Sequence, residues 1–551
     1  MPDNSTIADN FSLLSKLMDI HGENSFKAKS FANAAFTVEK LTTSLQDMPT
    51  EEIAKIKGIG DSISKSIQEM LQTEQWSLLD TYIEKTPSGI LEMMKIKGLG
   101  PKKIASIWKD LEVESLGELL YACNENRLML LKGFGQKTQD SVKQSIEFYF
   151  SNRDRYLFAE VEALANELEK DIQTIFAPAS ASLTGQIRRQ EIIIDEIELV
   201  VDASPELIQE KLNILTFIEE TPNSLLFRHA QKVKVRIYPS AIDDFGKSLF
   251  LTTATPAFIE SFFTAGGATG LTPGATEEQI FSQANLPYIP PCLRNDGSML
   301  NVQQLPNLIT PQDIKGIIHS HSTWSDGQYS LEEMALAAKA QGFEYLVISD
   351  HSRSAFYANG LSIERIAEQH AQIDALNQQL APFRIFKSIE ADILNEGNLD
   401  YPDEILASFD LVIASVHSNL KMSEEKAMSR LLKAIENPYT TILGHMTGRL
   451  LLSRNGYPVD HRRIIDACAE HHVVIELNAH PRRLDIDWEW IPYAREKGVL
   501  LSIDPDAHSI EGYKDVYYGT LAARKGGLTA DGNLSSYSKE ALENYILNRK
   551  K

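Results

Sequence analysis

The sequence predicts a multidomain protein with an all-α N-terminal region, an α+β middle region and a C-terminal α/β region built on parallel strands. Three observations predict this order. The first 150 residues are helical in period, the segment from about 155 mixes strand and helix patterns, and beyond Pro311 apolar strand-like runs alternate with helical stretches. A chain of 551 residues is also too long for one ordinary core.

Composition excludes several classes of protein. The cysteines Cys123, Cys292 and Cys468 lie far apart without CxxC spacing, which argues against a disulfide framework or a thiolate zinc site. The N-terminus lacks a secretory pattern and no apolar run is long enough to cross a bilayer. We therefore expect a soluble cytoplasmic protein without a membrane partner.

Charge alone does not indicate a nucleic-acid binder, because the net charge is −22. Residues 1–150 are closer to balance, with 17 Lys+Arg against 21 Asp+Glu. Any DNA contact must therefore come from local geometry and small basic clusters.

One short pattern occurs three times in the N-terminal region, as "IKGIGDSISKSI" (56–67), "IKGLGPKKIASI" (96–107) and "LKGFGQKTQDSV" (131–142). The two glycines permit a tight turn into a helix, whose first amides are unpaired and can hold a phosphate. These repeats are similar to helix-hairpin-helix motifs, which hold the DNA backbone without reading its sequence. The alternative is a glycine-linked helical array. The predicted DNA contacts are Lys57, Gly58, Gly60, Lys97, Gly98, Gly100, Lys102, Lys132, Gly133 and Gly135.

The middle region contains strand patterns in "ASLTGQIRRQEIIIDEIELVVDA" (181–203) and "KVKVRIYP" (232–239), with "PELIQEKLNIL" as a helix between them. These segments, the hairpins before them and "EEQIFSQANLPYIPPCLR" (277–294) resemble the bacterial family X DNA polymerases. The resemblance covers nearly the whole chain. It implies activity on gapped, nicked or 3′-ended duplex DNA and association with the nucleoid.

The polymerase site departs from the family pattern. The family's metal-binding aspartates align with Glu196, Glu198 and Arg236, and a guanidinium opposes a metal ion. Gly185, Arg188 and Arg189 remain, but Gln186 replaces the family's serine, and the nucleotide clamp reads "LTTAT" (251–255). We expect nucleotidyl transfer to be absent or very weak, while Mg²⁺ at a residual site stays an open alternative.

Lyase chemistry is also not expected, because the family's Schiff-base lysine aligns with Ser66 and the neighbouring Lys65 points elsewhere on the helix. Lys27 and Lys29 in "NSFKAKSF" are interpreted as phosphate contacts or as ordinary solvated lysines.

Potential metal ligands end nearly every strand-like run beyond Pro311. In a barrel of parallel strands the C-terminal ends meet at one mouth, where active sites form. These side chains should therefore converge. They are His319, His321 and Asp326 in "GIIHSHSTWSDG", Asp350 and His351 in "YLVISDH", Glu390 in "RIFKSIEADI", His417 in "LVIASVH", His445 in "TILGH", His480 in "VVIELNAH", and Asp506 and His508 in "LLSIDPDAH".

This set is similar to that of the polymerase and histidinol phosphatase (PHP) domain, a distorted seven-stranded α/β barrel that holds three metal ions. The resemblance implies one ion on His319, His321, Glu390 and Asp506, a second on Glu390 and His417, and a third on Asp326, His351, His445 and His508. Mixed imidazole and carboxylate ligands suit zinc or manganese without choosing between them.

Two further residues are predicted to assist catalysis. Arg449 in "GHMTGRLLL" could hold a phosphate oxygen or form a surface salt bridge, and Asp350 could orient an imidazole. His480 is either a substrate contact or a bystander.

The favoured function is DNA phosphoester hydrolysis by the C-terminal domain, as a 3′-5′ exonuclease or on abasic sites or 3′ blocking groups. The alternatives are a working gap-filling polymerase with an attached exonuclease, a small-molecule phosphatase and a non-enzymatic DNA scaffold. The predicted domains are a helical domain (1–90), hairpin fingers (91–152), a degenerate palm (153–240), a thumb and linker (241–311) and the metal-dependent domain (312–551). The sequence is silent on oligomeric state.

Overall fold

The computed structural model describes residues 2–41, 43–265, 271, 273–302 and 304–549. Contacts divide the chain into two compact units, Met1–Arg153 and Asp154–Lys551, and each is described by itself. The finer five-part division of the chain stays a prediction.

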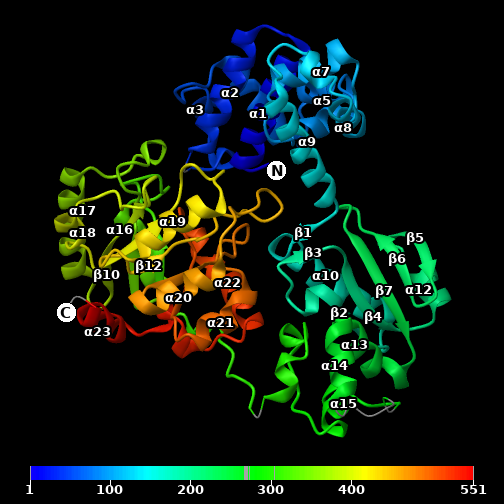
Figure 1. The fold of residues 1–551 in the computed structure, drawn as a ribbon. Coiled ribbons are helices and arrows are strands. Elements are labelled where there is room, and N and C mark those ends of the chain that lie inside the picture. Colours follow the sequence, from blue (N-terminus) through cyan, green and yellow to red (C-terminus); the bar gives the residue numbers. More distant parts are fainter. Residues whose placement is uncertain (1, 42, 266–270, 272, 303, 550–551) are drawn as a thin grey trace. The chain divides into compact units, whose positions relative to one another are not determined.

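The first unit is all-α (Figure 1). Its centre is aromatic, since the ring of Trp76 lies 5.2 Å from Phe11 and 5.6 Å from Phe31, centroid to centroid. The helices are α1 (Asn4–His21), α2 (Ser25–Glu39), α3 (Thr50–Ile53), α4 (Asp61–Thr73), α5 (Ser77–Glu84), α6 (Ser88–Met93), α7 (Pro101–Leu111), α8 (Leu116–Asn124) and α9 (Gln136–Ser151). The predicted all-α class of this region is confirmed.

The second unit begins with a mixed sheet of order β2-β4-β7-β6-β5, in which β4 and β7 are parallel and the other pairs are antiparallel. Its strands are β2 (Ala181–Thr184), β4 (Ile197–Asp202), β5 (Thr216–Thr221), β6 (Ser224–Arg228) and β7 (Lys234–Ser240); β1 (Tyr156–Leu157) pairs with β3 (Ile193–Ile194). The helices are α10 (Phe158–Phe176), α11 (Gly185–Arg188), α12 (Pro205–Lys211), α13 (Phe245–Thr253), α14 (Pro256–Thr264) and α15 (Glu277–Gln283). The segment expected as strand over 181–203 is therefore interrupted by α11.

A parallel sheet follows, with its seven strands paired in chain order. The strands are β8 (Gly316–Ser320), β9 (Tyr345–Ile348), β10 (Arg384–Asp392), β11 (Leu411–Ser415), β12 (Ile442–Leu443), β13 (Val474–Asn478) and β14 (Leu501–Asp504). The backbone after β14 pairs with the end of β8, since the amide of His321 donates to the carbonyl of Ala507 at 2.8 Å. The sheet is therefore a nearly closed barrel, as predicted.

Side-chain alternation along these strands separates two apolar layers. Ile318, Val347 and Ile413 belong to an inner cluster, which the last helix completes with Leu542 and Ile546. The outer strand faces pack against helices in a larger cluster. The helices are α16 (Leu331–Ala340), α17 (Ile363–Leu380), α18 (Asp403–Leu406), α19 (Glu424–Ile435), α20 (His461–His471), α21 (Ile491–Glu496), α22 (Val516–Lys525) and α23 (Lys539–Arg549).

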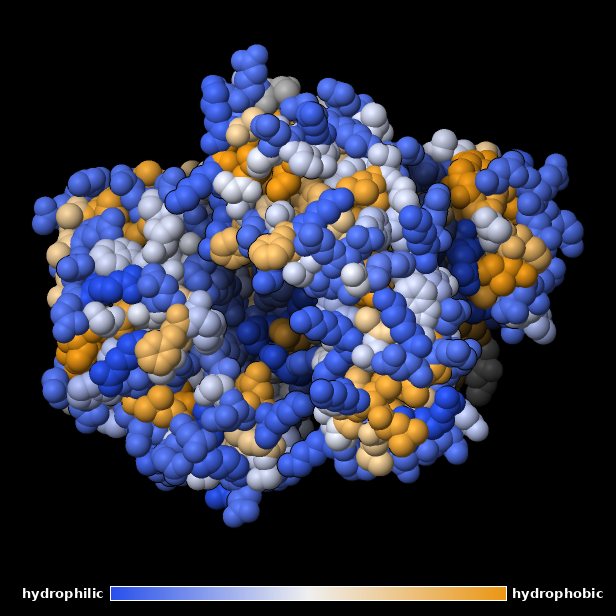
Figure 2. Space-filling view, turned by 90° about the horizontal axis from the view of Figure 1, so that it is seen from above, coloured by the Kyte–Doolittle hydropathy of each residue, from blue (hydrophilic) through white to orange (hydrophobic). Residues whose placement is uncertain are grey.

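The surface in Figure 2 is mostly hydrophilic, with hydrophobic side chains in small separate groups. Among the described residues, the helices are all too short or too polar to span a membrane.

Candidate functional site

The candidate metal ligands lie at the carboxyl ends of the barrel strands. Glu390 is on β10, and the other eight lie at the end of a strand or in the loop that follows it. His319 and Asp506 adopt positive φ angles of 61° and 53°, which are unusual for non-glycine residues and tend to occur at functional sites. The register of β8 shifts between Ile317 and Ser320, where His319 lies. This irregularity is not visible in the sequence.

The first group contains His319, His321, Glu390 and Asp506, whose candidate ligand atoms all lie within 4.8 Å of one another. Nε2 of His319 is 3.3 Å from Oε1 of Glu390 and 3.4 Å from Oδ1 of Asp506. Two ligands bonded to one tetrahedral zinc ion lie about 3.4 Å apart. The grouping matches the set predicted for the first ion.

The second group contains His321, Asp326, His351 and His508. Oδ1 of Asp326 lies 3.6 Å from Nε2 of His351 and 3.4 Å from Nε2 of His508. Nδ1 of His321 is 3.9 Å from the same oxygen, while its Nε2 faces the first group.

The third group is centred on Glu390 and contains His351 and His417. Nε2 of His417 lies 3.1 Å from Oε1 of Glu390, and Nε2 of His445 lies 3.0 Å from the same oxygen. Glu390 therefore belongs to two of the groups, and its bridging of two ions stays a prediction.

The predicted grouping of His445 with Asp326, His351 and His508 is corrected by this geometry. His445 follows β12, which pairs with β11, the strand that ends before His417. Asp326, His351 and His508 follow β8, β9 and β14, which are neighbours on the other side of the barrel. Strand order therefore places His445 beside Glu390 and His417.

The donor set fits divalent cations. Several polar atoms are buried and make no hydrogen bond, namely Nε2 of His319, Nδ1 of His321, Nδ1 of His351, Oε2 of Glu390 and Nδ1 of His445. Such atoms are costly unless another partner satisfies them. Nδ1 of His351 and Oε2 of Glu390 are 2.9 Å apart without hydrogen-bond alignment, as expected for two ligands directed at a common point.

Two buried carboxylates hold the imidazoles from outside and were missed in the sequence. Glu476 lies 2.5 Å from Nδ1 of His319, and Asp392 lies 2.5 Å from Nδ1 of His417. Such contacts keep Nδ1 protonated and leave Nε2 for a metal. The available signal was strand period two, because Asp392 follows Glu390 by two residues on β10.

Charge within the cluster keeps its carboxylates ionised. Burial opposes ionisation of Glu390, but the imidazolium charges of His417 and His319 outweigh it and hold the Glu390 pKa well below its usual range. Burial likewise opposes protonation of His417, but Glu390 and Asp392 raise its pKa to about 10. The centre is thus built to hold positive charge.

The predicted catalytic role of Asp350 is not supported. Its buried carboxylate accepts hydrogen bonds from the amide and Oγ of Ser322 at 2.9 and 2.8 Å, from Oγ of Ser325 at 2.5 Å and from Gln369 at 2.7 Å. It contacts no imidazole among these partners. Asp350 instead holds the turn that carries Asp326.

Arg449 is also corrected. Its guanidinium donates to the carboxylate of Asp487, to the carbonyl of Arg483 at 2.9 Å and to the carbonyl of Leu484. These partners occupy the donors that a phosphate would need. The arginine beside the metal ligands is Arg483, whose Nε lies 3.7 Å from Oδ2 of Asp506. His480 is half-buried, and its Nδ1 accepts from the amide of Arg482 at 3.2 Å.

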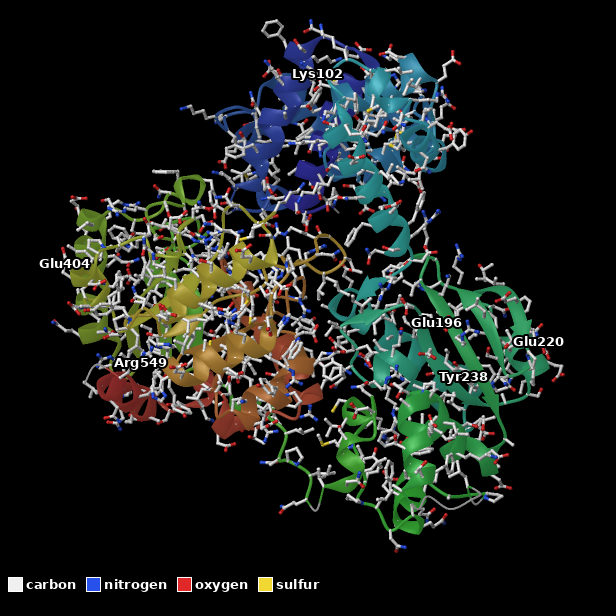
Figure 3. The ribbon with its side chains drawn as sticks, in the orientation of Figure 1. Lys102, Glu196, Glu220, Tyr238, Glu404 and Arg549 are labelled. Atoms are coloured by element: carbon white, nitrogen blue, oxygen red, sulfur yellow. The ribbon has the colours of Figure 1, made fainter. Side chains whose placement is uncertain are left out.

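The three N-terminal turns share one geometry. Gly58, Gly98 and Gly133 have φ angles of 96°, 90° and 90°, which a side chain would disfavour. The helices that follow begin after Gly60, Gly100 and Gly135 without a side-chain cap, so their first amides are open to a ligand. All these glycines are exposed, together with Lys57, Lys97, Lys102 and Lys132; Lys102 is labelled in Figure 3.

A cavity of about 480 Å³ lies between α2 and the first turn. It is lined by Lys27, Ser30, Asn33, Gly58 and Ser62, among others. Lys29 is exposed on α2 and does not line this cavity. Lys27 is therefore better placed than Lys29 to meet a phosphate at the first turn.

The residues aligned with polymerase carboxylates are paired with protein groups. Arg236 donates twice to the carboxylate of Glu196, with 3.0 Å between Nη2 and Oε2. Glu198 accepts from the amide of Gln186 at 2.9 Å and from Tyr238 at 3.0 Å. Glu196 and Tyr238 are labelled beside the middle sheet in Figure 3.

The residues next to these carboxylates also lie against protein groups. Gly185 has a φ of 59°, and a Cβ added to it would lie 1.6 Å from Oε2 of Glu198. Arg188 contacts Glu277, with 2.5 Å between Nη2 and Oε2, and Nη1 of Arg189 donates to the carbonyl of Thr253 at 2.6 Å. The retained arginines are thus held by protein acceptors.

Three family models match the sequence. They are a Helix-hairpin-helix domain over residues 2–76, a SAM-like Helix-hairpin-helix tandem over residues 90–147 and a PHP domain over residues 318–480.

Similar proteins fall into two groups. The chain is 32% identical over 552 residues to the DNA polymerase/3′-5′ exonuclease PolX of Bacillus subtilis (strain 168), which covers 96% of each chain. A probable phosphatase of Caldanaerobacter subterraneus subsp. tengcongensis is 30% identical over 207 residues, 34% of this chain and 74% of the relative. A probable phosphatase of Thermoanaerobacter sp. (strain X514) is 27% identical over 240 residues, 40% of this chain and 93% of the relative.

Proposed function

The chain belongs to the family of the DNA polymerase/3′-5′ exonuclease PolX, and from this premise we propose that its C-terminal domain hydrolyses phosphodiesters at DNA 3′ ends. The observation that carries the proposal is the cage of nine imidazole and carboxylate side chains, eight in the three groups and His445 in contact with Glu390. Several of its buried nitrogen and oxygen atoms lack hydrogen-bond partners. Activity on abasic sites or 3′ phosphates would use the same centre.

Three divalent ions, zinc or manganese, would be held by the groups around His319, His351 and His417, with Glu390 shared. When bound, such ions supply Lewis acidity toward a phosphate and acidify water. Glu476 and Asp392 orient the imidazoles that would hold them. Arg483, beside Asp506, is placed to bind a phosphate oxygen as the nonbridging charge develops.

The experiment that tests this proposal is digestion of a 5′-labelled, gapped duplex by purified full-length protein with added Mn²⁺ or Zn²⁺. Shortening of the labelled strand from its 3′ end is expected. If the protein hydrolyses small phosphate esters but leaves the duplex intact, the proposed 3′-end hydrolysis is wrong and the protein is a small-molecule phosphatase. That alternative is favoured by the barrel's likeness to probable phosphatases.

We further propose that the chain has lost template-directed synthesis. Two carboxylates that would hold Mg²⁺ are engaged, Glu196 by Arg236 and Glu198 by Tyr238 and the amide of Gln186. A fixed cation lies on the strand where the family has an aspartate, so metal binding there is opposed by charge.

Primer extension on a gapped duplex with Mg²⁺ or Mn²⁺ is therefore expected to give no product above background. The assay uses Glu390→Gln protein, so that removal of added nucleotides cannot hide synthesis. The control is the same protein carrying Glu404→Gln in place of Glu390→Gln, which reports any effect of digestion. Sustained incorporation of nucleotides would contradict the loss.

The hairpin turns are proposed to bind DNA through phosphates. Replacing Lys57, Lys97 and Lys132 with alanine removes three exposed cations beside the open helix ends. Each lost phosphate contact lowers the slope of log affinity against log salt by about 0.9, so the triple variant should lose about 2 to 3 in slope.

Fluorescence anisotropy over a salt series measures this change. Lys16, Lys40 and Lys85 are exposed lysines outside the turns, and their triple alanine variant is the matched control. Equal slopes for the two variants would show that the turns do not contact phosphates.

A further inference from the structure

The loop after β9 presents two large aromatic side chains at the edge of the metal centre. Phe356 is 88% exposed and Tyr357 is 74% exposed, on a short 3₁₀ turn (Phe356–Ala358) that follows the candidate ligand His351. The Tyr357 ring centroid lies 6.3 Å from that of His351. Contiguous exposed apolar surface, unlike a single exposed side chain, is a mark of binding sites.

Hydrogen bonds hold the loop in this conformation, so the exposure of the two aromatic side chains is a feature of the fold. Ser354 donates to Asp400 at 2.7 Å through its amide and to Asp392 at 2.6 Å through Oγ. The next turn closes through the amide of Gly360, which donates to the carbonyl of Ala355 at 3.2 Å. Ala355, Ala358 and Leu361 are buried while the two aromatic residues between them are not.

The surroundings of Tyr357 identify the kind of ligand. The Tyr357 ring lies beside that of His351, one of the candidate metal ligands. Arg483 lies beside another of them, with its Nε 3.7 Å from Oδ2 of Asp506. A ligand at this edge would thus place its phosphate beside Arg483 and the metal centre. Its other end would then lie against the two aromatic rings.

We propose that Phe356 and Tyr357 form a stacking platform for the nucleobase of the 3′-terminal nucleotide. We expect the platform to take an unpaired 3′-terminal base, because a base that leaves the duplex can turn its face toward the two rings, whereas a paired base is held in the plane of its base pair. Aromatic stacking tolerates any base, which suits an enzyme that removes successive nucleotides. The inference rests on the proposed 3′-end hydrolysis and adds how the terminal nucleotide is held.

The test compares two 5′-labelled duplexes with single-stranded 3′ overhangs, one ending in thymidine and one in an abasic tetrahydrofuran residue. The parent is expected to cleave the thymidine end with about 10- to 100-fold higher kcat/KM. Tyr357→Ala should lose that preference, Phe356→Ala should weaken it, and Tyr357→Phe should retain it. Leu547→Ala, which removes an exposed apolar side chain on α23, is the matched control and should behave as the parent.

A second readout does not depend on hydrolysis. An overhang ending in 2-aminopurine is bound to the full-length protein in the presence of a chelator, and stacking is expected to quench its fluorescence in the parent but not in Tyr357→Ala. Quenching that survives in Tyr357→Ala, absence of quenching in the parent, or an unchanged base preference in Tyr357→Ala overturns the platform. Failure of the parent to cleave either duplex, with quenching intact, would instead count against the proposed hydrolysis.

Discussion

Replacing Glu390 with glutamine is expected to lower the rate of 3′-end digestion about 1000-fold, equivalent to ~4 kcal/mol of transition-state stabilisation. The substitution keeps the size of the side chain but removes the negative charge that faces His319, His417 and His445. An amide is also a much weaker ligand for a divalent cation. The bridging position makes one substitution act on more than one ion.

Two measurements check this expectation. Elemental analysis of the purified variant should show fewer bound metal ions than the parent, and digestion of a labelled 3′ end should fall as stated. DNA binding through the hairpin turns should be unchanged, because these turns belong to the other unit of the chain. Glu404→Gln, at an exposed position of α18 labelled in Figure 3, is the matched control.

If Glu390→Gln keeps both the metal content and the activity of the parent, Glu390 is not a bridging ligand. Normal metal content with lost activity would place its role in catalysis without metal binding, which also contradicts the proposed cage.

Replacing Glu277 with glutamine is expected to destabilise the second unit by about 3 to 5 kcal/mol. Glu277 is buried at the start of α15, and its carboxylate contacts Arg188 and the fully buried Arg294. Oε1 of Glu277 lies 2.5 Å from Nη1 of Arg294. Removing one partner of such a cluster leaves buried positive charge uncompensated, which is the costly case for a buried ion pair.

Urea denaturation at neutral pH measures this loss as a lower transition midpoint. Glu278→Gln is the matched control, because it changes the next residue of the same helix at an exposed position. Equal midpoints for the two variants would show that the buried cluster contributes nothing to stability.

The same carboxylate predicts a pH dependence. Burial raises the pKa of Glu277, but the contacts with Arg188 and Arg294 outweigh it and lower the pKa overall. A lowered folded-state pKa gives stability that is present above the unfolded value of 4.5 and lost as pH falls through the folded value. The parent should therefore lose more stability on acidification than Glu277→Gln does.

The sequence was informative where local pattern determines local structure. Three glycine turns before amphipathic helices predicted the hairpins of the first unit, and alternating strand and helix patterns after Pro311 predicted the parallel barrel. Candidate ligands could be found because strand ends at a barrel mouth repeatedly carried imidazole or carboxylate groups.

The sequence was less informative where two distant segments must meet. Arg449 and Arg483 are both arginines near strand ends, yet one donates to Asp487 and backbone carbonyls while the other lies beside Asp506. Glu476 and Asp392 looked like ordinary strand residues until their imidazole partners were placed. Arg236 was expected to oppose a metal ion, but its pairing with Glu196 through two hydrogen bonds was not expected.

By itself, the sequence determined which types of side chain lie at the ends of the strands, because these follow from the backbone period. It also determined the glycine turns that precede helices of the first unit, because these follow from the placement of the glycines. Only the tertiary structure decided which of those side chains share a site. His445 stands with Glu390 because β12 pairs with β11, and Asp326 stands with His508 because the chain after β14 returns to β8. Hydrogen bonds between strands far apart in the chain set those neighbours, and no local pattern records them.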